Sequence, residues 1–265
     1  MRMMSIASGS SGNCIYIGTD NTHIIIDDGI SKKKVLEGLN RLEIKAEDID
    51  AILITHEHDD HIKGLGVFER HSITPIYASE GTTKYIASYS QLGRMPDGIY
   101  HTFNAGDSFK IKDLTINTVK VSHDAADPVA YTFTDGRKKA GIITDLGEYD
   151  SETVHKFSDL DTMLIEANHD INMLLNGPYP YPLKQRILGN RGHLSNEACG
   201  RLLGEILNDK VEHIFLGHLS RENNFPELAH ETVRAEINLG DNRFNADDFD
   251  IQVAPRQCPS DIIII

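Results

Sequence analysis

Short apolar runs that end in polar side chains recur along the whole chain. The clearest is 51–55, a β-branched run typical of a buried strand, which leads directly into three histidines and three acids at 56–61. Comparable strand ends bearing polar residues stand at positions 27, 123, 145, 168 and 218. Six such ends, spread over nearly the whole sequence, predict one catalytic domain over residues 1–265.

The remaining pattern predicts the other elements. Strands are expected near 14–17, 23–26, 75–78, 111–122, 129–134, 140–144, 162–165, 213–217 and 249–253. Helices are expected after Ser31 and Ser195 and near 64–71, 80–92, 171–176, 182–189 and 226–239. Residues 5–13 are predicted to form a Gly/Ser-rich loop, which either presents backbone N–H groups to an anion or is a plain turn. The tail at 255–265, with its Ile262–Ile265 run, is either an added edge strand or disordered.

The cluster at 56–61 has the composition of a metal site. Imidazole nitrogen and carboxylate oxygen together suit zinc, manganese or iron. On extended backbone His56 and His58 face the same side, whereas Asp60 and His61 turn toward another face, which suits a second ion. Buried without partners, these groups would destabilise the protein by several kcal/mol. The cluster therefore predicts metal binding.

The arrangement His56-x-His58-x-Asp60-His61 after a strand resembles the signature of the metallo-β-lactamase superfamily. This resemblance implies an α/β fold of the four-layer αβ/βα sandwich type, with a two-metal site along one edge. It implies that Asp27, or less favourably Asp28, orients the metal-binding loop through hydrogen bonds. The ligand sets it implies are His56, His58 and His123 for one ion and Asp60, His61 and His218 for the other, with Asp145 bridging both.

Two close divalent ions lower the pKa of a water between them and make hydroxide available near neutral pH. Such a centre supports hydrolysis of an ester-like electrophile and does not select phosphorus over carbon. A carbon-centred metallohydrolase, such as a thioesterase or a lactonase, therefore stays open. A one-iron dioxygenase, which uses fewer of these ligands, and a non-enzymatic binding module are further alternatives.

Four blocks carry a narrower resemblance, to the YycJ/WalJ branch of the superfamily. The blocks are Ser8–Asn13, Glu166–Asp170, Gly192–Glu197 and His218–Asn224. Members of this branch are similar to the PhnP and RNase Z phosphodiesterases and are regarded as 5′→3′ DNA exonucleases. The resemblance covers about residues 5 to 240. It implies a metal-dependent phosphodiesterase that acts on nucleic acid, DNA rather than RNA, or on a small phosphodiester.

Within this branch, His193 and His169 are candidate catalytic residues together with Asp60. Each of the two histidines either contacts phosphate or protonates the leaving oxygen, or else orients a metal ligand from behind. Candidate substrate-binding residues that can donate to phosphate oxygens are Asn168, Ser195 and Asn196, of which the last two open a helix whose N-terminus favours anions. A basic cluster of Lys184, Arg186 and Arg191 either follows a nucleic-acid backbone or is a solvated helix face.

Charge and cysteine content limit how the protein can bind a polyanion and in which compartment it is expected. With 26 basic and 40 acidic residues the formal charge is −14, so the overall field does not attract nucleic acid, and local charge must hold a polyanion. Three widely spaced cysteines without a CxxC pair favour a reducing compartment and hence the cytoplasm. No apolar stretch is long enough for a transmembrane helix, so no membrane association is expected.

Overall fold

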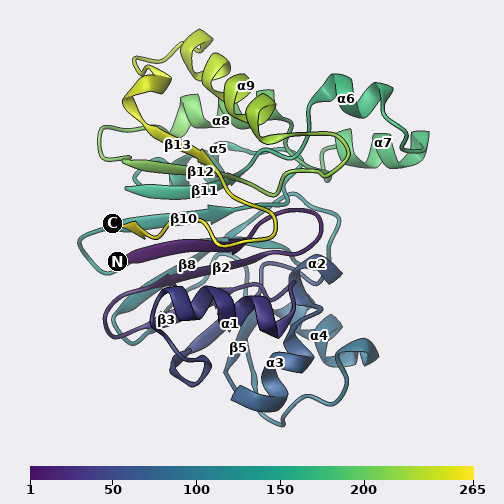
Figure 1. Cartoon of the computed structure of the whole chain (residues 1–265), viewed down its shortest axis with the longest axis vertical. Coiled ribbons are helices and arrows are strands. Elements are labelled where there is room, and N and C mark those ends of the chain that lie inside the picture. Colours follow the sequence, from purple (N-terminus) through teal and green to yellow (C-terminus); the bar gives the residue numbers. More distant parts are fainter.

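Two seven-stranded sheets lie face to face in the computed structural model, which describes residues 1–265 (Figure 1). The first has the order β14-β1-β2-β3-β4-β5-β6, and the second the order β13-β12-β11-β10-β9-β8-β7. The strands of the first sheet are β1 (Arg2–Ala7), β2 (Cys14–Gly18), β3 (His23–Ile26), β4 (Ala51–Leu53), β5 (Ile76–Ser79), β6 (Tyr100–Phe103) and β14 (Ile263–Ile264). Those of the second are β7 (Ser108–Ile111), β8 (Leu114–Lys120), β9 (Val129–Thr134), β10 (Lys139–Ile143), β11 (Thr162–Glu166), β12 (His213–Gly217) and β13 (Asp250–Val253).

Helices cover the outer faces of both sheets. Beside the first sheet lie α1 (Lys32–Arg41), α2 (Asp59–Ile62), α3 (Leu65–Ser72) and α4 (Glu80–Ser88). Beside the second lie α5 (Ser151–Phe157), α8 (Asn196–Ile206) and α9 (Pro226–Leu239), whereas α6 (Ile171–Asn176) and α7 (Tyr181–Leu188) stand at its edge (Figure 1). Short 3₁₀ turns occur at Ala46–Asp48, Ser90–Leu92 and Ala246–Asp248.

Three apolar cores correspond to the three spaces between four layers. One lies between the sheets and includes Ile24, Leu53 and Tyr131. A second joins the first sheet to α1 and α3, and a third joins the second sheet to α8 and α9. The strands buried on both faces read as continuous apolar runs, because neither side of them meets water. The αβ/βα sandwich expected from the sequence is therefore confirmed.

Strand direction brings the polar ends together. Strands β3 to β6 run parallel, as do β10 to β13. Strand β8 runs parallel to β10 through the intervening antiparallel β9. Since parallel strands deliver their carboxyl ends to one edge, the residues after β3, β4, β8, β10 and β12 meet along the same side of the sandwich.

Several predicted elements differ from the observed ones. The expected strand 111–122 is two strands, β7 and β8, because the chain turns at Lys112, whose φ of 49° is left-handed. The periodicity continues across this hairpin, which hides the turn from a pattern analysis. The expected helix 80–92 is α4 followed by a separate 3₁₀ turn. Residues 5–7 belong to β1, a strand absent from the prediction, so the Gly/Ser loop begins at Ser8.

The chain ends in an edge strand. Strand β14 pairs antiparallel with β1, with Met3 opposite Ile263, so the edge-strand alternative for the terminal isoleucines is the correct one and the disordered tail is wrong. None of the helices is both long and apolar enough to cross a membrane.

Candidate metal centre

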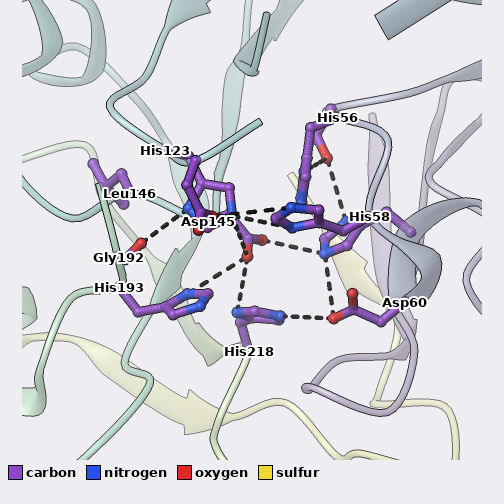
Figure 2. A network of polar contacts seen from close by, with 12 residues as sticks. His56, His58, Asp60, His123, Asp145, Leu146, Gly192, His193 and His218 are labelled. Atoms are coloured by element: carbon purple, nitrogen blue, oxygen red, sulfur yellow. Dashed lines mark hydrogen bonds and ion pairs between the residues drawn. The ribbon is translucent and has the colours of Figure 1, made fainter. Parts of the chain in front are cut away.

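The signature residues occupy the sharp connection from β4 to α2. His56 and His58 follow the strand, His58 on extended backbone, and the helix then begins at Asp59, so that Asp60 and His61 lie in its first turn. Figure 2 shows His56, His58, His123 and His218 converging with Asp60 and Asp145 on one space. The strand-end pattern of the sequence is therefore a spatial cluster, drawn from both sheets.

Potential ligand atoms form overlapping groups, within each of which they lie no more than 4.8 Å apart. These groups are His56, His58 and His123; Asp60, His61 and His218; His56, His61 and Asp145; and Asp145, Glu166, His193 and His218. The first two are the predicted ligand sets, and Asp145 occurs in both of the others. Asp145 thus lies between the sets, where a bridging carboxylate is expected.

Asp27 supports this centre from behind His61. Its Oδ2 accepts a hydrogen bond from His61 Nδ1 at 2.7 Å, and its Oδ1 accepts from the Thr55 backbone N–H at 2.8 Å. The contact leaves Nε2 of His61 facing the cluster, because a carboxylate on one ring nitrogen fixes the tautomer of the imidazole. Asp28 makes no such contact, since both of its carboxylate oxygens are buried without a partner.

Glu166 supports histidines on the other side of the cluster, as Asp27 supports His61. It was not among the site residues predicted from the sequence. At the end of β11, its Oε1 lies 2.8 Å from Nδ1 of both His218 and His193. Its Oε2 accepts from the backbone N–H groups of Leu146 and Leu194. The signal in the sequence was a glutamate at the end of a mostly apolar strand, because a buried charge there needs dedicated partners.

Neutral groups support His56 and His123. His123 Nδ1 lies 3.0 Å from the Gly192 carbonyl oxygen, and His56 Nδ1 lies 3.0 Å from the Thr55 hydroxyl. The Nε2 of His56 is buried with no hydrogen-bond partner, and His123 Nε2 lies 3.3 Å from Nδ1 of His58. An orphaned buried nitrogen and two imidazole nitrogens at this separation fit a cation placed among them.

Three of the strand ends use left-handed backbone. Asp27, Asp145 and His218 have φ values of 59°, 59° and 55°. This region is unfavourable for residues other than glycine, and asparagine and aspartate tolerate it best. Strain of this kind is concentrated at functional sites, where the surrounding structure holds it in place. Here it occurs at two residues of the cluster, Asp145 and His218, and at Asp27, which supports His61.

Burial and charge perturb these groups strongly. Burial opposes protonation of His218, yet the carboxylates of Asp145, Asp60 and Glu166 together raise its pKa to about 10. Burial likewise disfavours the charged carboxylate of Glu166, but His193 and His218 hold the pKa of Glu166 at about 2. The carboxylates are therefore anionic. A divalent cation bound among them would stabilise their negative charge.

The predicted substrate-side residues fall into two classes. His193 and Asn168 line a cavity of about 450 Å³ over the cluster, and Asn168 also donates to the His218 carbonyl oxygen. His169, Ser195 and Asn196 do not line it. Ser195 caps α8 through the Ala198 N–H, and their contact with substrate stays a prediction.

His169 and Asn196 occupy interior positions beside this cavity. The amide of Asn196 is wholly buried and exchanges hydrogen bonds with Asn224. Both ring nitrogens of His169 are buried without partners, and burial lowers its pKa to about 4. His169 is therefore neutral near pH 7.

Each residue of the predicted basic cluster has a hydrogen-bond partner within the protein, and its contact with nucleic acid stays a prediction. Lys184 donates to the Leu175 carbonyl oxygen, and Arg191 donates twice to the carbonyl oxygen of His123. Arg186 lines the cavity but forms an ion pair with Asp124.

Sequence comparisons agree with this geometry. Residues 22–219 match the model of the family described as "Beta-lactamase superfamily domain". The chain is 41% identical over 236 residues to the exodeoxyribonuclease WalJ of Streptococcus pneumoniae serotype 2 strain D39, covering 89% of this chain and 88% of that protein. It is 38% identical over 228 residues to the exodeoxyribonuclease YycJ of Bacillus anthracis, covering 86% of each.

A solved structure supports the fold independently. The metallo-β-lactamase fold protein YhfI from Bacillus subtilis superposes with a TM-score of 0.69 at 15% identity, over 98% of this chain and 99% of that one. The protein belongs to the β-lactamase superfamily of metal-dependent hydrolases. Within that superfamily it belongs to the group that contains WalJ and YycJ.

Proposed function

We propose that this protein is a two-metal exodeoxyribonuclease that hydrolyses DNA in the 5′→3′ direction. The observation that carries the proposal is the pair of three-ligand sets joined by Asp145, since one ion would need only one of them. The names of the two relatives, exodeoxyribonucleases at 41% and 38% identity, support DNA as the substrate. Three free cysteines support a cytoplasmic location.

The donor set fits two divalent ions, zinc, manganese or iron. One would be held by His56, His58 and His123 and the other by Asp60, His61 and His218, with Asp145 between them. Such ions supply a water of lowered pKa and stabilise the charge on phosphate oxygens. Asp60, which is half-buried and lines the cavity, is proposed to act both as a ligand and as a catalytic residue.

His193 is the proposed proton donor to the leaving oxygen. Its Nδ1 is held by Glu166, which leaves Nε2 as the nitrogen available to the cavity. Burial opposes protonation of His193, yet Glu166 and Asp145 raise its pKa above the usual value, which favours the protonated form that a proton donor needs. Asn168 is proposed to donate to a phosphate oxygen, and His169, Ser195 and Asn196 to shape the loop that carries His193.

Two experiments test this function. The first is metal-supplemented digestion of 5′-phosphorylated and 5′-hydroxyl DNA, single-stranded and duplex, with product mapping and a thioester as the comparison substrate. Hydrolysis of the thioester alone would favour the carbon-centred alternative. Elemental analysis of the same preparation should give two ions per chain, and one iron per chain would favour the dioxygenase alternative.

The second experiment separates proton donation from metal assembly. His193→Ala should keep both ions and lose about 10²–10⁴-fold in turnover of DNA, the usual size of a general acid–base contribution. The loss should shrink for a nitrophenyl phosphodiester, whose leaving group needs less protonation. His155→Ala, a change to an exposed histidine on α5, is the control. Loss of an ion by His193→Ala would instead assign His193 to metal binding.

A further inference from the structure

The cavity over the metal centre has an aromatic wall that the cleavage chemistry does not use. Tyr85 on α4 and Tyr89, four residues on, both line it, with ring centroids 5.4 Å apart. Tyr85 is 44% exposed and packs into none of the apolar cores, because α4 turns Thr82 and Ile86 inward instead. An exposed aromatic ring at the mouth of a site, without a packing role, is available for a ligand.

Tyr89 is fixed to the metal-binding connection. Its hydroxyl donates to Asp59 Oδ1 at 2.6 Å, and Asp59 begins the short helix that carries Asp60 and His61. The orientation of this ring is therefore coupled to the position of the metal ligands. Tyr85, tilted by 38° relative to Tyr89, extends the same surface away from the centre.

A second, mainly apolar wall comes from the other half of the sandwich. Tyr179, Leu183 and Ile187 line the same cavity from α7 and the segment before it. Helix α7 buries none of its residues, so these side chains are not part of a core. Figure 1 shows α4 and α7 on opposite sides of the edge that bears the metal centre. At about 450 Å³, the cavity has the size of a pocket for one small ligand, not for a duplex.

Charge in the cavity argues against recognition through the phosphate backbone. Arg186 is the one lysine or arginine among the lining residues, and it is paired with Asp124. Outside the proposed metal ligands, Glu57 and Asp59 also line the cavity. Because no unpaired lysine or arginine lines the cavity to hold further phosphates, binding beyond the scissile group is left to the bases, which stack on aromatic rings regardless of sequence.

We propose that Tyr85, supported by Tyr89, stacks on the nucleobase next to the phosphodiester that is cleaved, so that the enzyme accepts an unpaired terminal nucleotide. The inference rests on the proposed exodeoxyribonuclease function and adds a specificity-determining residue to it. A blunt duplex must fray at its end before the terminal base reaches this wall, which costs unstacking free energy. Single strands and ends with an overhang are therefore the better substrates.

The stacking is tested by changing the protein and the substrate, first separately and then together. Tyr85→Ala should lower kcat/KM for single-stranded DNA by roughly 5- to 150-fold, the factor that stacking of one base supplies. Removing the terminal base, by an abasic residue next to the cleaved bond, should lower kcat/KM of the wild type by a similar factor. The two changes together should cause no further loss, and Tyr85→Phe should retain most of the activity.

Binding gives a second readout that does not depend on turnover. A strand with 2-aminopurine at the terminal position should lose fluorescence on binding to the wild type, because the base stacks, and should lose far less with Tyr85→Ala. Tyr181→Ala is the matched control, since Tyr181 is 73% exposed on α7 and does not line the cavity. Its kinetics and quenching should equal those of the wild type.

The outcomes separate this inference from the function on which it rests. A wild-type protein that digests no DNA would refute the exonuclease function, whatever the variants do. A wild type that digests DNA, with Tyr85→Ala equally active on it, would refute the stacking alone. So would equal losses of Tyr85→Ala on intact and abasic strands, because a base cannot then be the partner of the ring.

Discussion

The two candidate ion sites of this protein differ in what stands behind their histidines. In the set of Asp60, His61 and His218, buried carboxylates hold both imidazoles, Asp27 at 2.7 Å and Glu166 at 2.8 Å. In the set of His56, His58 and His123, the supports are a hydroxyl and a backbone carbonyl. His58 makes no hydrogen bond of this kind, since Asp124 Oδ1 lies 3.9 Å from its Nε2, and its side chain is 30% exposed.

This difference predicts that the two sites bind their ions with different affinities. A carboxylate behind an imidazole raises its basicity and locks its tautomer, which strengthens metal binding. The set of Asp60, His61 and His218 is therefore expected to hold its ion tightly, as a permanent part of the structure. The set of His56, His58 and His123 is expected to hold its ion more loosely. Three measurements challenge or refine this comparison.

The largest effect is expected at the carboxylate that the two sites share. Asp145→Asn keeps the side-chain shape and the left-handed backbone, which asparagine tolerates, but removes the charge between the ions. Metal content should fall from two ions per chain to one or fewer, with a loss of affinity above the roughly 10–100-fold caused by removing an outer partner. Elemental analysis checks this, with the exposed Asp97→Asn as the control. Two tightly bound ions in Asp145→Asn would exclude a bridging role.

A smaller, one-sided effect is expected at Asp27. In Asp27→Asn the amide nitrogen faces His61 Nδ1, so that two donors oppose each other and the favourable tautomer is lost. One ion should bind about 10–100-fold more weakly while the other is retained. Asp28→Asn, the same substitution at the next residue, should leave both affinities unaltered, because the carboxylate of Asp28 makes no hydrogen bond to a ligand side chain. A stronger effect of Asp28→Asn would make Asp28 the orienting residue.

The smallest effect is the difference between the two sites in the intact protein. Titration with a chelator should remove the ions in two phases separated by roughly tenfold, the lower end of the effect of an outer carboxylate. Spectroscopy of the cobalt-substituted protein should assign the first phase to the all-histidine set. Glu166→Gln should reduce the difference in affinity between the two sites, since it removes the carboxylate that supports His218. Simultaneous loss of both ions from the wild type would mean that the sites are equal.

Much of the metal centre could be predicted from the sequence, because the ligands follow strongly patterned strands. A buried strand is recognisable by its apolar run, and its carboxyl end has little freedom, so Asp27, His56, Asp145 and His218 stand out as polar strand ends. Their separate roles were implied by the resemblance to the metallo-β-lactamase signature. The hairpin at Lys112 could not, since two adjoining strands share one periodicity. Strand β6 was missed for a related reason, because two of its four residues are exposed polar side chains.

The sequence by itself determined the fold class, the chemistry of the donor atoms and the strand ends that carry them. Only the tertiary structure decided which groups stand behind and around those donors. Glu166 supports two histidines far away in the chain, and Tyr85 shares a cavity with side chains from the opposite half of the sandwich. Local periodicity records whether a side chain faces a core or solvent. A contact between distant segments depends on how the layers pack, and no local pattern encodes it.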